Sequence, residues 1–138
     1  MEDDCGAVCN ILIMAILSTD SVTIKLGSYN NYKVFNDESV DETKSDAIDS
    51  RAAKAVTLIV EAGAGVSSGV VKLEGAPTSD YAGTWVEMAS LTINVASKIF
   101  SATVDVGDAN GLPMPYVRAR IETVIGGGTI DAYIITQT

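Results

Sequence analysis

The chain has 138 residues, 47% of them hydrophobic, which predicts one domain with a packed core. Nine Lys and Arg residues against 18 Asp and Glu residues give a net charge of −9, which repels phosphates, so nucleic acid is not an expected partner. Histidine is absent, which removes the commonest general base and side-chain metal ligand, so we expect no enzymatic activity, no bound metal and no cofactor.

Residues 1–21 are predicted to form an extended apolar arm ahead of the folded domain. The apolar run at residues 7–17 (AVCNILIMAIL) is shorter than the roughly 20 residues that span a bilayer. It follows the acidic residues Glu2, Asp3 and Asp4, where a secretory signal would carry positive charge, so no membrane partner is expected. Two interpretations stay open: an arm that docks on its own domain or on a neighbour, and a vector-derived or misassigned extension ahead of a natural start at Met14. We favour an arm held by a partner, so that deleting residues 1–13 weakens assembly. The candidate partner-binding residues are Ile11, Leu12, Ile13, Ile16 and Leu17.

Residues 22–51 are predicted to hold two leading strands and an acidic linker. The strands are expected at residues 22–26 and 32–35. The linker, residues 36–50, is rich in Asp, Glu and Ser, which favours an exposed loop or a short helical turn capped by Ser45 or Asp46. Ten acidic and three basic residues lie in the first fifty positions, so most of the net charge belongs to this part of the chain.

Residues 52–138 are predicted to form an all-β domain. Short apolar or alternating runs are separated there by clusters of Gly, Pro, Asn, Asp and Ser, which is typical of strands and turns. The expected strands are residues 55–62, 69–75, 84–89, 90–95, 98–106, 115–124 and 128–136. They predict an antiparallel β-sandwich with jelly-roll or immunoglobulin-like wiring, and the sequence does not decide between the two.

Alternation indicates which side chains of the last two strands face the core. In residues 115–124 the inward set is expected to be Val117, Ala119 and Ile121, and the outward set Arg118, Arg120 and Glu122. The last run is apolar on both faces, with Ile130, Ala132 and Ile134 on one and Tyr133 and Ile135 on the other. That strand is expected to be covered on both sides, and an interface is one possible cover.

Few side chains are candidates for chemistry. Arg118 and Arg120 form the best basic site and are expected either to pair with Glu122 or the acidic linker, or to bind a partner. The sole tryptophan, Trp85, is expected to anchor the core or to offer a stacking platform. Three strand carboxylates, Glu61, Glu74 and Glu87, leave open a pair of the glycosidase type, but nothing selects one. Asp108 and Asn110 fit a turn better than a calcium loop.

Two stretches of the sequence carry a family resemblance. The first is a hairpin containing Val71, Leu73, Glu74, Gly75, Gly83, Thr84 and Trp85. The second contains Tyr116, Val117, Arg118, Ala119, Arg120, Gly127, Gly128 and Thr129. Together they resemble small β-sandwich virion proteins of tailed phages, of the capsid decoration (cement), head-fibre or tail-associated type. The resemblance covers residues 52–138 and departs from the usual short Asp-Gly turn at residues 76–83 (APTSDYAG).

The resemblance implies a structural protein of the virion. The favoured function is a decoration or cement protein that binds the major capsid protein on the outer shell as a homo-oligomer, a trimer or a dimer. Its expected location is the capsid surface, after synthesis in the host cytoplasm. The alternative is a carbohydrate- or receptor-binding module of a phage fibre or tail, in which Tyr81, Trp85 and Tyr116 stack on a sugar.

Overall fold

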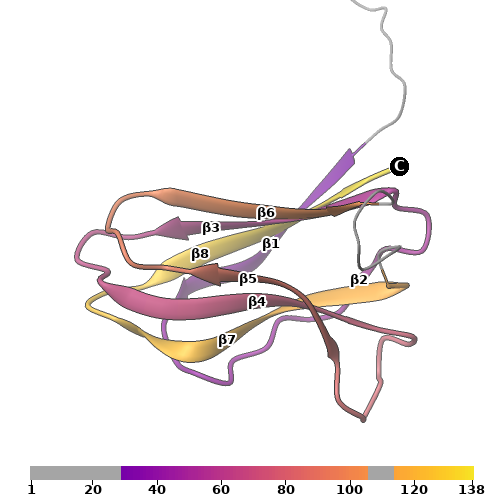
Figure 1. Ribbon diagram of the computed structural model, residues 1–138, viewed down its shortest axis with the longest axis horizontal. Helices are drawn as coiled ribbons and strands as arrows, with labels where there is room; N and C mark the ends of the chain where they lie inside the picture. The colour runs from indigo at the N-terminus through magenta and orange to yellow at the C-terminus, as the bar shows by residue number, and fades with distance from the viewer. Residues whose placement is uncertain (1–28, 106–113) are drawn as a thin grey trace, which may run out of the picture.

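Two antiparallel four-stranded sheets face each other in the computed structural model, which describes residues 29–105 and 114–138 (Figure 1). One sheet has the strand order β1-β8-β3-β6 and the other β2-β7-β4-β5. The strands are β1 (Tyr29–Glu38), β2 (Ile48–Asp49), β3 (Ala55–Ala62), β4 (Ser68–Ala76), β5 (Val86–Thr92), β6 (Ile99–Asp105), β7 (Tyr116–Gly126) and β8 (Ile130–Gln137). The predicted antiparallel β-sandwich is therefore confirmed. The arm at residues 1–21 and the strand expected at residues 22–26 lie outside the described residues.

The order in which strands pair defines the wiring. Strand β1 pairs with β8, β2 with β7, β3 with β6 and β4 with β5. Pairs nested in this way form one long antiparallel ribbon, and the further pairings of β3 with β8 and β4 with β7 fold that ribbon into two sheets. This arrangement is a jelly roll, so the structure decides between the two wirings that the sequence left open.

The core lies between the sheets and follows the period of two that strands impose. The predicted inward residues of β7 are fully buried, and so is one of the two apolar faces of β8; both meet apolar side chains from β3 and β4. The main members are Val56, Leu58, Val60, Val71, Leu73, Val117, Ala119, Ile121, Ile130, Ala132 and Ile134. β-Branched residues dominate this set because they pack well on a pleated surface.

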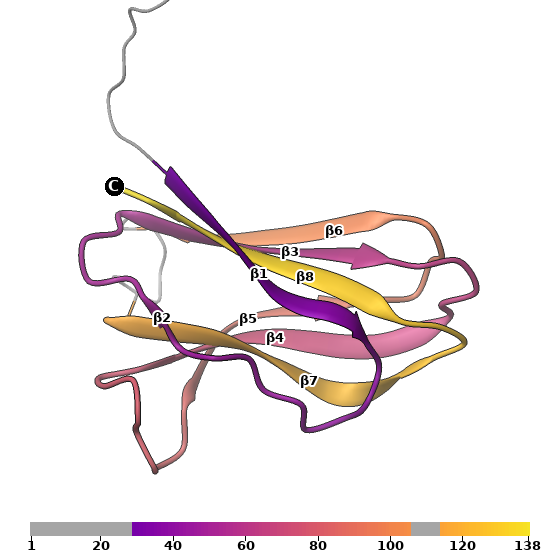
Figure 2. The ribbon, with the colours of Figure 1, turned by 180° about the vertical axis from the view of Figure 1, so that it is seen from behind.

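The acidic linker contains no helix, contrary to the interpretation that Ser45 or Asp46 begins one. It runs in extended form along the free edge of β7, as Figure 2 shows. The Glu42 amide donates to the Ile121 carbonyl at 2.7 Å, and the Ile121 amide donates to the Thr43 carbonyl at 2.9 Å. Ser45 Oγ accepts from the Ala119 amide at 2.9 Å. The backbone of β7 needs partners along this edge, and supplying them outweighs a local helical turn.

Two neighbouring turns at one end of the sandwich require glycine. Gly65, between β3 and β4, and Gly127, between β7 and β8, have φ values of 87° and 85°, which L-residues rarely adopt. A Cβ atom on Gly127 would overlap the carbonyl oxygen of Gly65. The two turns therefore pack backbone against backbone. The expected strands at residues 84–89 and 90–95 are in fact one strand, β5.

Candidate functional site

A carboxylate and two guanidinium groups meet on the outer face of the β2-β7-β4-β5 sheet. Glu74 of β4 stands opposite Arg118 in the register of β4 with β7. Its Oε1 accepts a hydrogen bond from Arg118 Nε at 3.0 Å, and its Oε2 accepts one from Arg120 Nε at 2.6 Å. Glu74 is only 5% exposed. Two cations on one almost buried carboxylate make a charge-assisted cluster that fixes the pairing of β4 with β7.

Trp85 covers the side of this cluster. The guanidinium carbon of Arg118 lies 4.1 Å from the centre of the Trp85 ring, which places the cation over the aromatic face. The indole Nε1 donates to the carbonyl of Tyr81 at 3.0 Å, so the polar group of the ring is satisfied. Trp85 is 7% exposed. The ring therefore anchors the long connection between β4 and β5 to the sheet.

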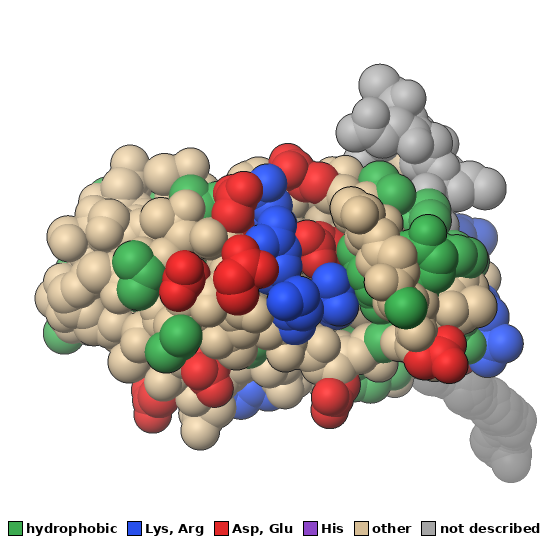
Figure 3. All heavy atoms as spheres, turned by 90° about the horizontal axis from the view of Figure 1, so that it is seen from below, with side chains coloured by type: hydrophobic (Ala, Val, Ile, Leu, Met, Phe, Trp, Pro, Cys, Tyr) green, Lys and Arg blue, Asp and Glu red, His purple; other side chains and the backbone are tan. Residues whose placement is uncertain are grey.

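The remaining charges on this face also pair with one another. Arg120 Nη1 contacts Glu42 Oε2 of the linker at 3.0 Å, and Lys72 Nζ contacts Glu87 at 2.7 Å and Glu122 at 2.9 Å. The hydrogen bond to Glu74 raises the pKa of Arg120, and those to Glu87 and Glu122 raise the pKa of Lys72. Figure 3 shows the basic side chains as a central stripe with acidic side chains beside it. Lys72, Arg118 and Arg120 are therefore each paired with at least one carboxylate.

The structure places the two predicted basic residues together but changes their partner. Arg118 and Arg120 point outward, as alternation predicted, and Arg120 reaches the acidic linker. Their main partner is Glu74, which the sequence offered as a strand carboxylate and as part of the resembling hairpin, but not as a partner of these arginines. The usable signal was a carboxylate facing outward in a mainly apolar strand, because such a group needs a cross-strand cation. Held by two arginines, Glu74 serves as a structural group.

The three aromatic residues of the carbohydrate alternative differ in environment. Trp85 is buried and has Arg118 on its ring, so a sugar would have to displace that guanidinium to stack there. Tyr116 is half-buried, with the Arg51 guanidinium 5.5 Å from the centre of its ring. Tyr81 is 40% exposed. Trp85 is thus buried as an anchor would be, but it packs against Arg118 on the outer side of its sheet and is not a member of the core cluster between the sheets.

The outer face of the other sheet has the opposite character. Outward side chains form rows across the strands in the order β1, β8, β3, β6. One middle row is Asn31, Ile135, Thr57 and Thr103. The other is Lys33, Tyr133, Ile59 and Ser101. The one charge in these rows is on Lys33 of β1, whose Nζ lies 5.8 Å from the centre of the Tyr133 ring. The rows on either side add charges, Asp131 and Glu61 on one side and Asp105 on the other. We call the surface made by Tyr29, Thr57, Ile59, Thr103, Tyr133 and Ile135 the uncharged face.

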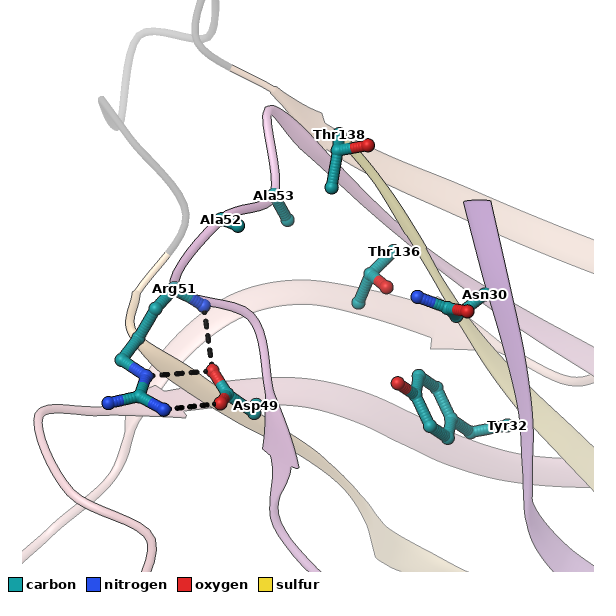
Figure 4. Close-up of a pocket in the computed structure, with 8 residues that line it drawn as sticks. All are labelled: Asn30, Tyr32, Asp49, Arg51, Ala52, Ala53, Thr136 and Thr138. Atoms are coloured by element: carbon teal, nitrogen blue, oxygen red, sulfur yellow. Dashed lines mark hydrogen bonds and ion pairs between the residues drawn. The ribbon is translucent and has the colours of Figure 1, made fainter. Parts of the chain in front are cut away.

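Hollows in the described surface are open and shallow. One of about 310 Å³ lies between β1, the end of β8 and the connection from β2 to β3, and Figure 4 shows the Tyr32 hydroxyl and the Asn30 amide turned toward it. Its charged members, Asp49 and Arg51, pair with each other at 2.6 Å. Hydrogen bonds from the side chain and backbone N–H of Arg51 lower the pKa of Asp49 to about 2. This pair contributes little binding capacity to the hollow.

Comparison with known proteins gives a fold counterpart and no sequence family. No family model matches the sequence, and no curated protein matches it. The chain is similar in fold to the solved structure of the SPBc2 prophage-derived protein YomS, with a TM-score of 0.55 and 9% identity over 86% of this chain and 100% of that chain. A structure from the disulfide-linked pili of Bacillus endospore appendages covers 87% of this chain and 97% of its own, with a TM-score of 0.41 and 11% identity.

Within residues 29–105 and 114–138 there is no helix with the length and hydropathy needed to cross a membrane. The predicted partner-binding residues of the arm, from Ile11 to Leu17, lie outside the part of the chain that the structure describes. The turn residues Asp108 and Asn110 lie outside it as well. The described candidates for function are therefore the two outer faces, one charged and one uncharged.

Proposed function

We propose that this chain is a non-enzymatic structural protein of a tailed-phage particle, namely a decoration protein that binds the outer surface of the shell. The observation that carries the proposal is the uncharged face. In a chain with a net charge of −9, the two central strands β3 and β8 turn Ile59, Tyr133 and Ile135 outward. Strands that are apolar on both sides are typical of sheets covered on both sides. A surface of this kind serves assembly better than it serves solubility.

The sequence resemblance supports the same proposal. The residues that carry it, Glu74, Trp85, Arg118 and Arg120, form one packed cluster instead of lying scattered. A cluster that fixes a hairpin to a sheet is a scaffold feature, which suits a protein that acts by holding a shape. The fold counterpart from a prophage agrees with this proposal. The jelly roll is also used by viral capsid and lectin domains, so the fold alone assigns no function.

In the proposed mechanism the contacts are physical and repeated. The uncharged face contributes buried apolar area, and the acidic linker lies on the far sheet, where it adds negative charge. A negative protein is repelled by packaged DNA and therefore suits the outside of a shell. Many weak contacts around a symmetric particle become strong through avidity. The partner in this proposal is the major capsid protein.

Particle binding tests the proposal. Purified chain is added to particles that lack it, the particles are sedimented, and bound chain is quantified with increasing input. We expect saturation at a fixed number of copies per particle and a rise in the temperature at which DNA is released. Binding that does not saturate, or that leaves the release temperature unchanged, contradicts a decoration role. A variant with the uncharged face altered, Tyr133→Lys, should bind less, and Val124→Lys on β7 is the matched control.

A further inference from the structure

We infer that the uncharged face is the acceptor for residues 7–17 of a second copy of this chain. The inference rests on the proposed function in one respect, because it names a contact by which copies assemble on a particle. It concerns the self-association of the chain and can be tested without any particle. Four observations carry it: the character of the face, its size, the direction in which the chain enters it, and the composition of the segment.

The centre of the uncharged face has apolar and hydroxyl side chains, which suit an occupant without charge. It presents Ile59, Tyr133 and Ile135, with the hydroxyls of Thr57 and Thr103 hydrogen-bonded to each other at 2.8 Å across β3 and β6. At the end near the chain entry lies an open hollow of about 330 Å³, lined by Tyr29, Thr57, Ile135 and Gln137. A hollow of that volume accommodates a large aliphatic side chain. None of these four lining residues is charged, so a charged occupant would gain no ion pair from them.

The size of the face argues against simple pairing of two such faces. Four strands about 4.8 Å apart and eight residues long cover about 500 Å². A stable interface usually buries about 800 Å² on each partner, so two faces stacked together fall short. A segment that crosses the face and continues beyond it can bury further area outside the face. The segment 7–17 is long enough to cross the face, since eleven extended residues span up to about 36 Å.

The start of β1 lies at one end of the uncharged face and points away from the body of the sandwich. Tyr29, the first residue of β1, pairs with Gln137 near the end of β8 and is 70% exposed. Figures 1 and 2 both show the start of β1 and the end of β8 projecting together beyond the body of the sandwich. Covering its own face would require the preceding chain to reverse direction. Reaching a neighbouring copy requires only that it continue.

The segment itself is the longest uncharged aliphatic run in the chain. Residues 7–17 contain five large aliphatic residues among eleven positions, together with Val8 and Met14, and no charged residue. Residues 18–28 separate them from β1, which gives about 36 Å of reach when extended. A donor segment on one copy and an acceptor face on the next form a heterologous contact. Such contacts close into rings or continue as open chains of subunits.

Three variants distinguish the segment that binds (the donor) from the uncharged face that receives it (the acceptor). The first lacks residues 1–17, the second carries Ile135→Lys on the uncharged face, and the third carries Val124→Lys. Val124 is 52% exposed on β7 of the other sheet, so the third variant controls for adding a lysine at an exposed apolar position. Circular dichroism and thermal unfolding establish that each variant is folded. Mass is then measured by light scattering after gel filtration.

We expect the unaltered chain and Val124→Lys to be oligomeric and the other two variants to be monomeric. Mixing the two monomeric variants should give a complex with one copy of each, because one retains the donor and the other the acceptor. Two monomers that fail to combine overturn the inference, as does an unaltered chain that is monomeric. An Ile135→Lys variant that stays oligomeric also overturns it, because the segment then binds elsewhere. A one-to-one complex together with absent particle binding would leave this inference standing and remove the proposed function.

Discussion

The Arg118 guanidinium lies over the Trp85 ring at 4.1 Å while its Nε donates to the almost buried carboxylate of Glu74. Arg118 thus joins a residue of the β4–β5 connection to the middle of β4. Because the planar guanidinium can stack and donate at the same time, a lysine could not replace it. This arrangement makes the charged outer sheet a fixed unit and leaves the opposite face as the surface available for assembly.

Replacing Trp85 by alanine should lower the free energy of unfolding by about 3–5 kcal/mol, because a large buried aromatic side chain leaves a cavity. Urea unfolding followed by circular dichroism measures the change. Val86→Ala, at the exposed neighbouring position, should change stability by less than about 0.5 kcal/mol. Equal effects of the two substitutions would mean that Trp85 does not anchor the β4–β5 connection.

A glycan array tests the carbohydrate alternative. If Trp85 is a packing anchor, a glycan array probed with the unaltered chain should show no specific binding. Tyr81→Ala, which removes the exposed aromatic side chain, should then leave the array result unchanged. Specific binding that is lost in Tyr81→Ala, with unfolding temperature unchanged, would favour a carbohydrate-binding module over a decoration protein.

Replacing Glu74 by glutamine should cost about 3 kcal/mol or more, because it removes the almost buried carboxylate of the cluster, which leaves Arg118 without a carboxylate partner and Arg120 with only the exposed Glu42. The matched control is Glu87→Gln, whose side chain is half exposed beside Lys72 and whose loss should matter much less. Chemical unfolding of both variants gives the comparison. A loss for Glu74→Gln no greater than that for Glu87→Gln contradicts the assigned role of the cluster.

The Asp49–Arg51 pair predicts a specific acid response. The pKa of Asp49 is lowered from 3.8 to about 2 in the folded chain, so the carboxylate stabilises the fold above pH 3.8 and that contribution is lost as the pH falls toward 2. Asp49→Asn should therefore lose less of its melting temperature between pH 5 and pH 2 than the unaltered chain does. Arg51→Ala should show the same flattening. Parallel curves for all three proteins would exclude a stabilising role for the pair.

Gly127→Ala should destabilise the fold by about 2 kcal/mol or more, because φ is positive there and the new Cβ would overlap the Gly65 carbonyl. Gly126→Ala is the control, since a Cβ at that position meets mainly the flexible Ser68 side chain. Thermal unfolding of both variants should place Gly127→Ala clearly below Gly126→Ala. The reverse order would mean that the two turns do not pack as described.

Local patterns predicted much of the sandwich. Alternation at Val117, Ala119 and Ile121 identified the inner face of β7, and the expectation that the last strand is covered on both sides stays a prediction, since Tyr133 and Ile135 on its outer side are half-buried. Pairing over long sequence distances was not predictable in the same way. Glu74 and Arg120 are 46 residues apart, and their contact depends on the register of β4 with β7.

Composition predicted a loop in the acidic linker but not the contacts that the loop makes with β7. The linker's Asp, Glu and Ser residues favour a loop or a helix start when taken alone. In the folded chain the open edge of β7 offers backbone groups to Glu42, Thr43 and Ser45, and those hydrogen bonds decide the conformation. The wiring was undetermined for a related reason, since jelly-roll and immunoglobulin-like sandwiches have the same strand signals and differ only in which strands become neighbours.

Cryo-electron microscopy of the parent phage particle tests the central claim most directly. A map that resolves strands would locate the sandwich and show what covers Ile59, Tyr133 and Ile135. We predict density for this chain on the outer surface of the shell, with the uncharged face in contact with protein and the Glu74 cluster intact on the opposite sheet. Density beneath the shell in contact with DNA, or an uncharged face open to solvent in every copy, would contradict the account.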